Sequence, residues 1–309
     1  MSLDVSVVIE WDNPHLLEAP GREEIALRRA AEELTDCGRP AEVIVVCGEA
    51  EVGVVRRLVE QHFASFDARV LPVRDHGYYD MKNAGAAVAR GKWIVLTDSD
   101  VVLEPHAIAR MVEVLESRNA DVVCGAAYVD PSTLAGRLWT FLFVFPPRNE
   151  SNAVRKVTRF FANLVAFRRE VALRFPFPND HRMRGQCVSL AQELGRSGIT
   201  IWEAGGARTM HPAPATAGQF LRRAVWQAYD LVATHRMHAS LAVAVAHAAG
   251  SIARMTGTRL LRLARHWPRV ARAWWEPPFT AAVIAAFGVL QVAALILPIV
   301  TKGVPARLR

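Results

Sequence analysis

A short apolar strand that ends in two carboxylates constrains this chain more than any other feature. Residues 93–97 read Trp-Ile-Val-Leu-Thr, an apolar run typical of a buried strand, and Asp98 and Asp100 follow it. The Ala-rich segment Tyr79–Ala89 before the strand is predicted to be a helix, closed by Gly91. Ligands of α/β sheets usually bind where strands end. Two acids there suit a hard divalent cation, which prefers oxygen ligands.

Predicted strands and helices alternate along the first hundred residues. The strands have β-branched apolar runs, and the helices have apolar residues at helical spacing with charges between them. This alternation predicts an α/β domain built on a parallel sheet covered by helices. In chain order the expected segments are strand 5–9, helix 22–34, strand 43–46, helix 52–63, strand 70–73, helix 79–89 and strand 93–97.

The region around the two acids resembles family 2 glycosyltransferases of the GT-A fold. The residues that carry the resemblance are Gly77, Asn83, Gly85, Ala89, Gly91, Trp93, Asp98 and Asp100. The resemblance extends more thinly from Val5 to about His211. It implies a Rossmann-like, mixed but mostly parallel sheet with flanking helices. It also implies transfer of a sugar from a nucleoside diphosphate sugar, with a UDP-sugar as the expected donor and inversion at the anomeric carbon.

The resemblance also assigns roles to individual side chains. Asp98, Asp100 and His211 are expected to hold Mg²⁺ or Mn²⁺ on the donor diphosphate. Donor contacts are expected from Trp11, Glu49, Lys82, Asn83 and Asp98. Three of these residues have a plain structural alternative: Trp11 as a packing residue, Lys82 as a surface lysine and His211 as a structural histidine.

The general base of the inverting reaction is the point where the sequence departs from the family. The family usually places Glu-Asp at the start of a helix, about a dozen residues before the glycine that ends it. Counting back from Gly198 reaches Gln186 and Cys187, which are not carboxylates. Asp180 is the preferred candidate base, with helix capping as its alternative role. His181, whose side chain titrates near neutrality, or an acceptor that is already ionised would also satisfy the chemistry.

A second family element is loosely matched further along the chain. Gln219, Arg222, Arg223 and Trp226 resemble the Q-x-x-R-W element of processive, membrane-bound relatives, although Trp226 does not directly follow the arginines. Arg222, Arg223 and Trp226 are therefore candidate substrate-binding residues. The alternative is an ordinary basic amphipathic helix.

The C-terminal third predicts a membrane anchor. Residues 279–300 contain no charged side chain and are long enough to cross a hydrocarbon core of roughly 30 Å. Trp274 and Trp275 precede this segment, where interfacial tryptophans collect. More basic residues stand before it than after it, which favours a single-pass protein of the cell membrane with its catalytic domain in the cytoplasm. Residues 241–250 are expected to form an interfacial or packed helix rather than a second span.

Net charge and cysteine content limit the classes of binding partner and the compartment. The chain has a net charge of +7 and an isoelectric point near 9.7. Because the arginines cluster beside the apolar segment, an anionic membrane is the expected partner and nucleic acid is not. The four cysteines have neither metal-binding spacing nor a C-x-x-C pair, which indicates a reducing compartment.

The expected organisation has three parts: a GT-A domain over residues 1–215, basic interfacial helices over 216–276, and a transmembrane helix with a short basic tail over 277–309. The expected acceptor is a lipid-linked or surface glycan.

Two other functions are alternatives to sugar transfer. A catalytically inactive nucleotide-sugar-binding or scaffold subunit would explain the missing Glu-Asp. A nucleotidyltransferase would need a glycine-rich basic loop after the first strand, and residues 10–14 do not provide one.

Overall fold

The computed structural model of the 309-residue chain describes residues 3–11, 21–74, 77–142, 145–179, 185–214, 216–236 and 239–296. The chain divides into two compact units, which are described separately. Unit 1 comprises Met1–Tyr128, Arg148–Asn179 and Gln186–His211. Unit 2 comprises Val129–Pro147, Asp180–Gly185 and Pro212–Arg309.

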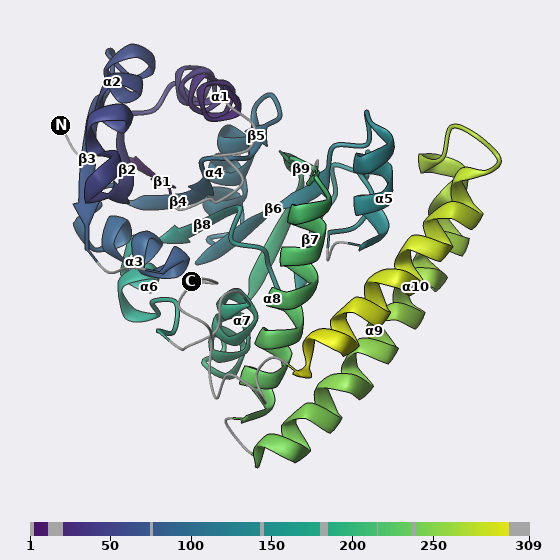
Figure 1. Cartoon of the computed structure of the whole chain (residues 1–309). Helices are drawn as coiled ribbons and strands as arrows, with labels where there is room; N and C mark the ends of the chain where they lie inside the picture. Colours follow the sequence, from purple (N-terminus) through teal and green to yellow (C-terminus); the bar gives the residue numbers. More distant parts are fainter. Residues whose placement is uncertain are drawn as a thin grey trace. The chain divides into compact units, whose positions relative to one another are not determined.

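Unit 1 is built on one mixed sheet. The described strands are β1 (Val5–Glu10), β2 (Ala41–Gly48), β3 (Asp67–Val73), β4 (Trp93–Asp98), β5 (Val102–Leu103), β6 (Val122–Val129), β7 (Val154–Val157), β8 (Leu164–Arg168) and β9 (Ile201–His211). They are ordered β3-β2-β1-β4-β8-β6-β9-β5, with β7 paired to β9 (Figure 1). The first four strands pair in parallel, whereas β8 is antiparallel to β4 and β6, and β9 is antiparallel to β5 and β7. The predicted mixed α/β fold is confirmed, but its parallel half stops at β4.

Helices cover both faces of this sheet (Figure 1). One face packs against α1 (Arg22–Cys37), α2 (Val52–His62) and α4 (Ala107–Ser117). The other packs against α3 (Tyr78–Val88), α6 (Arg169–Arg174) and α7 (Gln186–Arg196). All six side chains of β1 and of β4 are buried. This explains their continuous apolar sequences, because a parallel strand covered on both faces has no solvent-facing side.

Two glycines allow α3 and the turn after it to lie close to β1. A Cβ atom at Gly85 would stand 2.3 Å from Val8 Cγ1, and one at Gly91 would stand 2.6 Å from the Ser6 backbone nitrogen. The expectation that Gly91 closes the helix as a left-handed cap is wrong. The helix ends at Val88, its C-cap residue Ala89 is extended, and Gly91 is required for close backbone approach instead.

Unit 2 is helical. Its described helices are α5 (Leu134–Leu142), α8 (Ala217–Arg236), α9 (Leu241–Val270) and α10 (Glu276–Ala294). Small and branched apolar residues fill the core shared by α8, α9 and α10, among them Ala228, Ala244, Ala248 and Ile252. Small side chains at such positions let helix backbones approach closely. The packed-helix expectation for residues 241–250 is consistent with this arrangement, although the helix extends to Val270.

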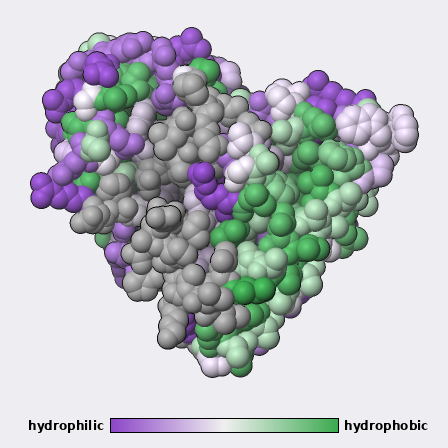
Figure 2. Space-filling view, viewed as in Figure 1, coloured by the Kyte–Doolittle hydropathy of each residue, from purple (hydrophilic) through white to green (hydrophobic). Residues whose placement is uncertain are grey.

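The exposed face of α10 is apolar, and its buried face contains both polar and apolar side chains. Its polar side chains Thr280 and Gln291 are buried, whereas Phe279, Val289 and Val292 are exposed. Figure 2 shows apolar residues gathered over α9 and α10. Within the described part of the chain, α10 is the one helix long and apolar enough to cross a membrane by length and composition, with about a third of it buried. It begins three residues before the predicted span, at Glu276.

Candidate functional site

The candidate site lies where β1 and β4 end. The two strands are parallel neighbours, and their register places Glu10 beside Asp98. Both side chains are buried, with exposed fractions of 0% and 3%. Because parallel strands end at the same edge of a sheet, the edge that carries Asp98 also carries a second carboxylate. Glu10 was not predicted as a site residue, although it is a charged residue directly after the apolar run of β1.

Asp98 is held by three side chains, two from helix α3 and one from the segment before β8. The Tyr78 hydroxyl lies 2.7 and 2.8 Å from its two carboxylate oxygens. Lys82 Nζ donates to Oδ1 at 2.5 Å, and Asn163 Nδ2 donates to Oδ2 at 3.3 Å. Lys82 is fully buried and also donates to the Thr97 carbonyl at 3.2 Å. The Asp98 carboxylate is therefore fixed in orientation and has a matching positive charge beside it.

Asp100 and His211 come together from distant parts of the sequence. Asp100 follows β4 and His211 ends β9, and both are buried. Asp100 Oδ2 lies 3.6 Å from His211 Nε2. The Ser99 hydroxyl between the two acids is buried and has no hydrogen-bond partner among the described residues. Strand β5 pairs with the end of β9, which fixes the histidine next to the loop that carries Asp100.

The donor atoms at this edge suit a divalent cation. A carboxylate and an imidazole are ligands that Mn²⁺ accepts, and Mg²⁺ is commonly held by one or two carboxylates with substrate phosphates and water. The described residues contain no group of three or more His, Cys, Asp or Glu side chains arranged for a metal ion.

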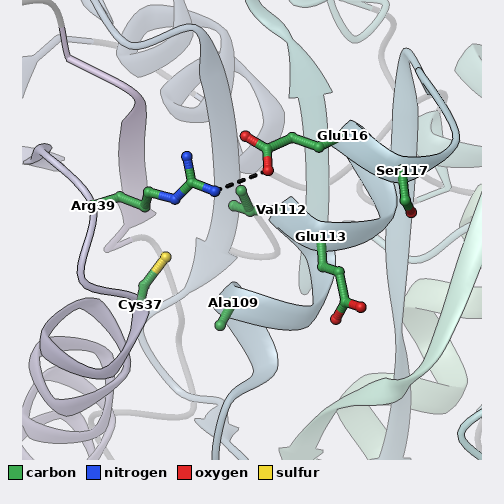
Figure 3. A pocket seen from close by; sticks show the side chains of 7 residues that line it. All are labelled: Cys37, Arg39, Ala109, Val112, Glu113, Glu116 and Ser117. Atoms are coloured by element: carbon green, nitrogen blue, oxygen red, sulfur yellow. Dashed lines mark hydrogen bonds and ion pairs between the residues drawn. The ribbon is translucent and has the colours of Figure 1, made fainter.

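The described residues of unit 1 line a hollow at the strand end and a second, more open one. A narrow one adjoins the strand end and is lined by Ile9, Ala26, Leu27, Ala30, Thr97, Asp98, Ser99, Val101 and Leu103. An open surface pocket lies between the end of α1 and α4 (Figure 3), lined by Cys37, Arg39, Ala109, Val112, Glu113, Glu116 and Ser117. An ion pair of 2.9 Å between Arg39 and Glu116 crosses the open pocket. Because its lining includes neither Asp98 nor Asp100, the open pocket is not the candidate site.

The other predicted donor residues of unit 1 have local partners. Trp11 is 7% exposed and belongs to the core cluster, and Glu49 is exposed and forms an ion pair with Arg74. The Asn83 side chain is used at both ends: Nδ2 donates to the Phe177 carbonyl at 2.8 Å and Oδ1 accepts from the Phe177 amide at 2.9 Å. Asn83 therefore fastens α3 to the segment after α6.

The region of the general base is described only in part. Asp180 and His181 lie outside the described residues. Helix α7 begins at Gln186, and Gly198 after it has a φ of 78°, the left-handed conformation common for a glycine that follows a helix. The usual position of the base therefore carries Gln186 and Cys187. Burial raises the pKa of the Cys187 thiol, which disfavours a reactive thiolate.

The three predicted substrate residues of α8 belong to unit 2. The Arg222 guanidinium stacks over the Trp226 ring at 6.0 Å, and Arg223 stacks over Trp139 at 5.8 Å. Trp226 Nε1 is buried and has no hydrogen-bond partner among the described residues. These contacts hold the three side chains against helices of their own unit.

Known proteins resemble the chain in both sequence and fold. Residues 23–174 match the family model described as glycosyl transferase family 2. No curated protein matches the sequence. The mannosyltransferase PcManGT from Pyrobaculum calidifontis, solved with GDP-Man and Mn²⁺, has a TM-score of 0.56 at 16% identity, covering 96% of this chain and 87% of its own.

A more distant likeness is to GalNAc-T7, solved with UDP, GalNAc and Mn²⁺. Its TM-score is 0.48 at 11% identity, over 69% of this chain and 44% of the other. The mannosyltransferase likeness establishes the fold, and the family model covers strand β4 with Asp98 and Asp100. The chain is therefore a glycosyltransferase whose residues 23–174 belong to glycosyl transferase family 2.

Proposed function

We propose that the protein transfers a sugar from a nucleoside diphosphate sugar to a lipid-linked or surface-glycan acceptor, with inversion at the anomeric carbon. A UDP-sugar is the proposed donor. GDP-mannose is the first alternative, because a mannosyltransferase of similar fold was solved with it. The observation that carries the proposal is the arrangement of Asp98, Asp100 and His211 at one sheet edge. Asp98 and Asp100 lie within the residues that match family 2.

The proposed donor site uses the two acids differently. Asp98 is already satisfied by Tyr78, Lys82 and Asn163, so it is suited to position the donor with little rearrangement. Asp98, Asp100 and His211 are the proposed ligands of Mg²⁺ or Mn²⁺ at the donor diphosphate. When bound, such a cation offsets the negative charge of the leaving diphosphate.

The remaining proposed contacts surround this edge. Trp11 and Glu49 are proposed on the nucleoside side, because both follow strands that end there. Lys82 contributes through its ion pair with Asp98, and Asn83 contributes by holding α3 against Phe177. Arg222, Arg223 and Trp226 remain the proposed substrate-binding residues of unit 2.

Asp180 is the proposed general base. A carboxylate close to the acceptor hydroxyl would accept its proton as the oxygen attacks the anomeric carbon on the face opposite the diphosphate. The supporting observation is indirect: α7 begins with Gln186 and Cys187, so the carboxylate must come from another position.

We also propose a membrane anchor at α10, with the catalytic unit in the cytoplasm and a single crossing of the cell membrane. Support comes from the outward-facing apolar residues of α10 and from its buried Thr280 and Gln291. Polar side chains within membrane helices characteristically face the protein interior. The proposed division into residues 1–215, 216–276 and 277–309 follows from this placement.

Turnover of candidate donors tests the proposal. Detergent-solubilised protein is mixed with lipid extract and with UDP-sugars or GDP-mannose, and nucleotide release is measured with Mn²⁺ or with a chelator. We expect release that requires the metal and falls by roughly 10²-fold or more in Asp180→Asn. Metal-independent release, or full activity of Asp180→Asn, contradicts the assigned roles.

One observation favours a second function. Because Gln186 and Cys187 occupy the usual position of the base, a catalytically inactive nucleotide-sugar-binding or scaffold subunit is the alternative. That function predicts metal-dependent nucleotide binding without turnover of any donor in the presence of lipid acceptors.

A further inference from the structure

A buried arginine lies at the centre of unit 2. Arg259, in the middle of α9, is 5% exposed. Its Nη1 donates to Gln291 Oε1 of α10 at 3.1 Å, and its Nη2 donates to Gln227 Oε1 of α8 at 3.0 Å. Gln291 Nε2 also donates to Gln227 Oε1 at 2.8 Å, and the guanidinium lies 5.1 Å from the Phe287 ring centre. One cation therefore joins all three helices through neutral amides.

The charge of Arg259 is not balanced by a carboxylate. No Asp or Glu of the described residues comes within ion-pair distance of it. Residues 212–309 contain twelve Lys and Arg but two acids, Asp230 and Glu276. Glu276 is already bound by Arg137, at 3.0 and 2.8 Å. Arg262, one turn further along α9, adds positive charge to the same region.

The guanidinium nevertheless remains charged at neutral pH. Burial, and then the positive charge of Arg262, lower the pKa of Arg259 to about 10. Buried charges in proteins are normally paired with an opposite charge, because an unpaired one is costly to remove from water. Arg137 of the same unit differs: it is half-buried, and its Nε and Nη2 both donate to the Glu276 carboxylate.

We propose that Arg259 is the centre of a phosphate-binding site for the headgroup of a membrane lipid. A guanidinium offers planar, paired donors that fit phosphate oxygens, and the two glutamine amide oxygens accept from those donors in the present structure. Gln227 is half-buried, so the cluster reaches the surface on its side. The apolar outer face of α10, next to the cluster, suits the chains of the same lipid. The inference rests on the proposed membrane placement of α10 and specifies the chemistry by which the protein recognises a lipid.

A purely structural Arg259 would behave differently from a phosphate site. If its amide bonds and its contact with Phe287 are its whole role, replacing it destabilises the protein equally in all lipids. If it binds phosphate, the stabilisation by a phosphate lipid is itself lost. The difference in melting temperature between lipids therefore separates the two roles, because a ligand stabilises the state that binds it.

The experiment measures thermal unfolding of the full chain in micelles of neutral detergent, with phosphatidylcholine alone or with added phosphatidic acid. The variants are Arg259→Gln, Arg259→Lys and the control Arg254→Gln. Arg254 is an exposed arginine of the same helix that bonds Ser251, so it matches the charge change. We expect phosphatidic acid to raise the Tm of wild type and Arg254→Gln by about 3 °C or more. Arg259→Gln should lose at least half of the rise, and Arg259→Lys should lose less.

An equal rise in Arg259→Gln and wild type overturns the proposal. If Arg259→Gln does not fold, Arg259→Lys is the deciding variant. A rise in Tm with phosphatidic acid that is as large in Arg259→Lys as in wild type also overturns the proposal. So does an equal reduction of that rise in Arg259→Lys and Arg254→Gln. A separate arm adds millimolar inorganic phosphate to micelles without phosphatidic acid. A rise as large as that with phosphatidic acid identifies a free-phosphate site and overturns the lipid assignment. Nucleotide binding by the same samples reports on unit 1, so failure of this inference and failure of the proposed transferase function give different results.

Discussion

Buried charge is the dominant residue-scale feature of unit 1. Lys82 and Asp98 are both removed from solvent, with side-chain exposures of 0% and 2%. A buried ion pair adds little net stability relative to apolar residues, but loss of one partner leaves the other charge unpaired. The pair is therefore a fixed, sensitive element at the edge where the donor is proposed to bind.

Lys82→Met tests this sensitivity. The substitution keeps most of the side-chain volume but leaves Asp98 with only Tyr78 and Asn163 as donors. We expect the free energy of unfolding to fall by about 3–5 kcal/mol. Lys92→Met is the matched control, because Lys92 is exposed and lies over the Trp93 ring, and it should cost about 1 kcal/mol or less. Equal losses in urea unfolding would contradict the buried-pair account.

Glu42 is expected to contribute to unfolding of the protein in acid. Burial opposes its charged form, but hydrogen bonds from Ser6 and Arg90 outweigh burial, so its pKa lies below the ordinary value of 4.5. A carboxyl group whose folded pKa is depressed stabilises the fold above its unfolded pKa and loses that contribution as the pH falls. We expect Glu42→Gln to lower the Tm at pH 7 and to have a much smaller effect well below pH 4.5. A Tm difference independent of pH would contradict this account.

Part of the candidate site could be predicted from sequence, and part could not. A strand followed by Asp98 and Asp100 is a local pattern, and the structure places His211 beside Asp100 as expected. Tyr78 and Asn163 were missed because they reach Asp98 through tertiary packing, which no local spacing reveals. The roles of Asp98, Asp100 and His211 stay predictions, as does that of Asp180.

At the scale of elements, close helix–strand packing explains the family glycines. Gly85 lies against Val8 and Val46, and Gly91 lies against the backbone of β1. Hydrophobic runs predicted β1 to β4 and the helices between them. Both faces of β1, β2 and β4 are buried, whereas β3 is only partly buried. Strands β5 and β7 have two and four residues and were missed, since pairing with β9 rather than composition creates them.

Gly85→Ala tests the packing argument directly. The new Cβ would stand 2.3 Å from Val8 Cγ1 and 2.9 Å from Val46 Cγ2, so α3 or β1 must move. We expect a loss of about 1–3 kcal/mol in the free energy of unfolding. Gly53→Ala in α2 is the control, because nothing lies within 4 Å of its Cβ position and alanine favours the helix. Urea unfolding should show stabilisation or no change there; a similar loss at both sites would contradict the argument.

At the scale of the whole molecule, the apolar exposed face of α10 supports the proposed anchor. We expect Val289→Lys to weaken retention in carbonate-washed membranes, because a charge near the centre of a span costs about 2.5–3.5 kcal/mol and Val289 is 69% exposed. Val54→Lys, on an exposed position of α2, should leave retention unchanged. Equal retention of Val289→Lys and wild type would contradict a membrane-spanning α10.

The proposed donor site is tested most directly by isothermal titration with UDP, with and without Mn²⁺, on wild type, Asp100→Ala and Asp36→Ala. Asp36 is a carboxylate of α1 with 46% side-chain exposure and serves as the charge-matched control. We predict UDP binding that requires Mn²⁺, is retained in Asp36→Ala and is abolished in Asp100→Ala. Metal-dependent binding that survives in Asp100→Ala would contradict the assignment of the site. Absence of UDP binding with any metal would overturn the UDP donor and direct the same titration to GDP.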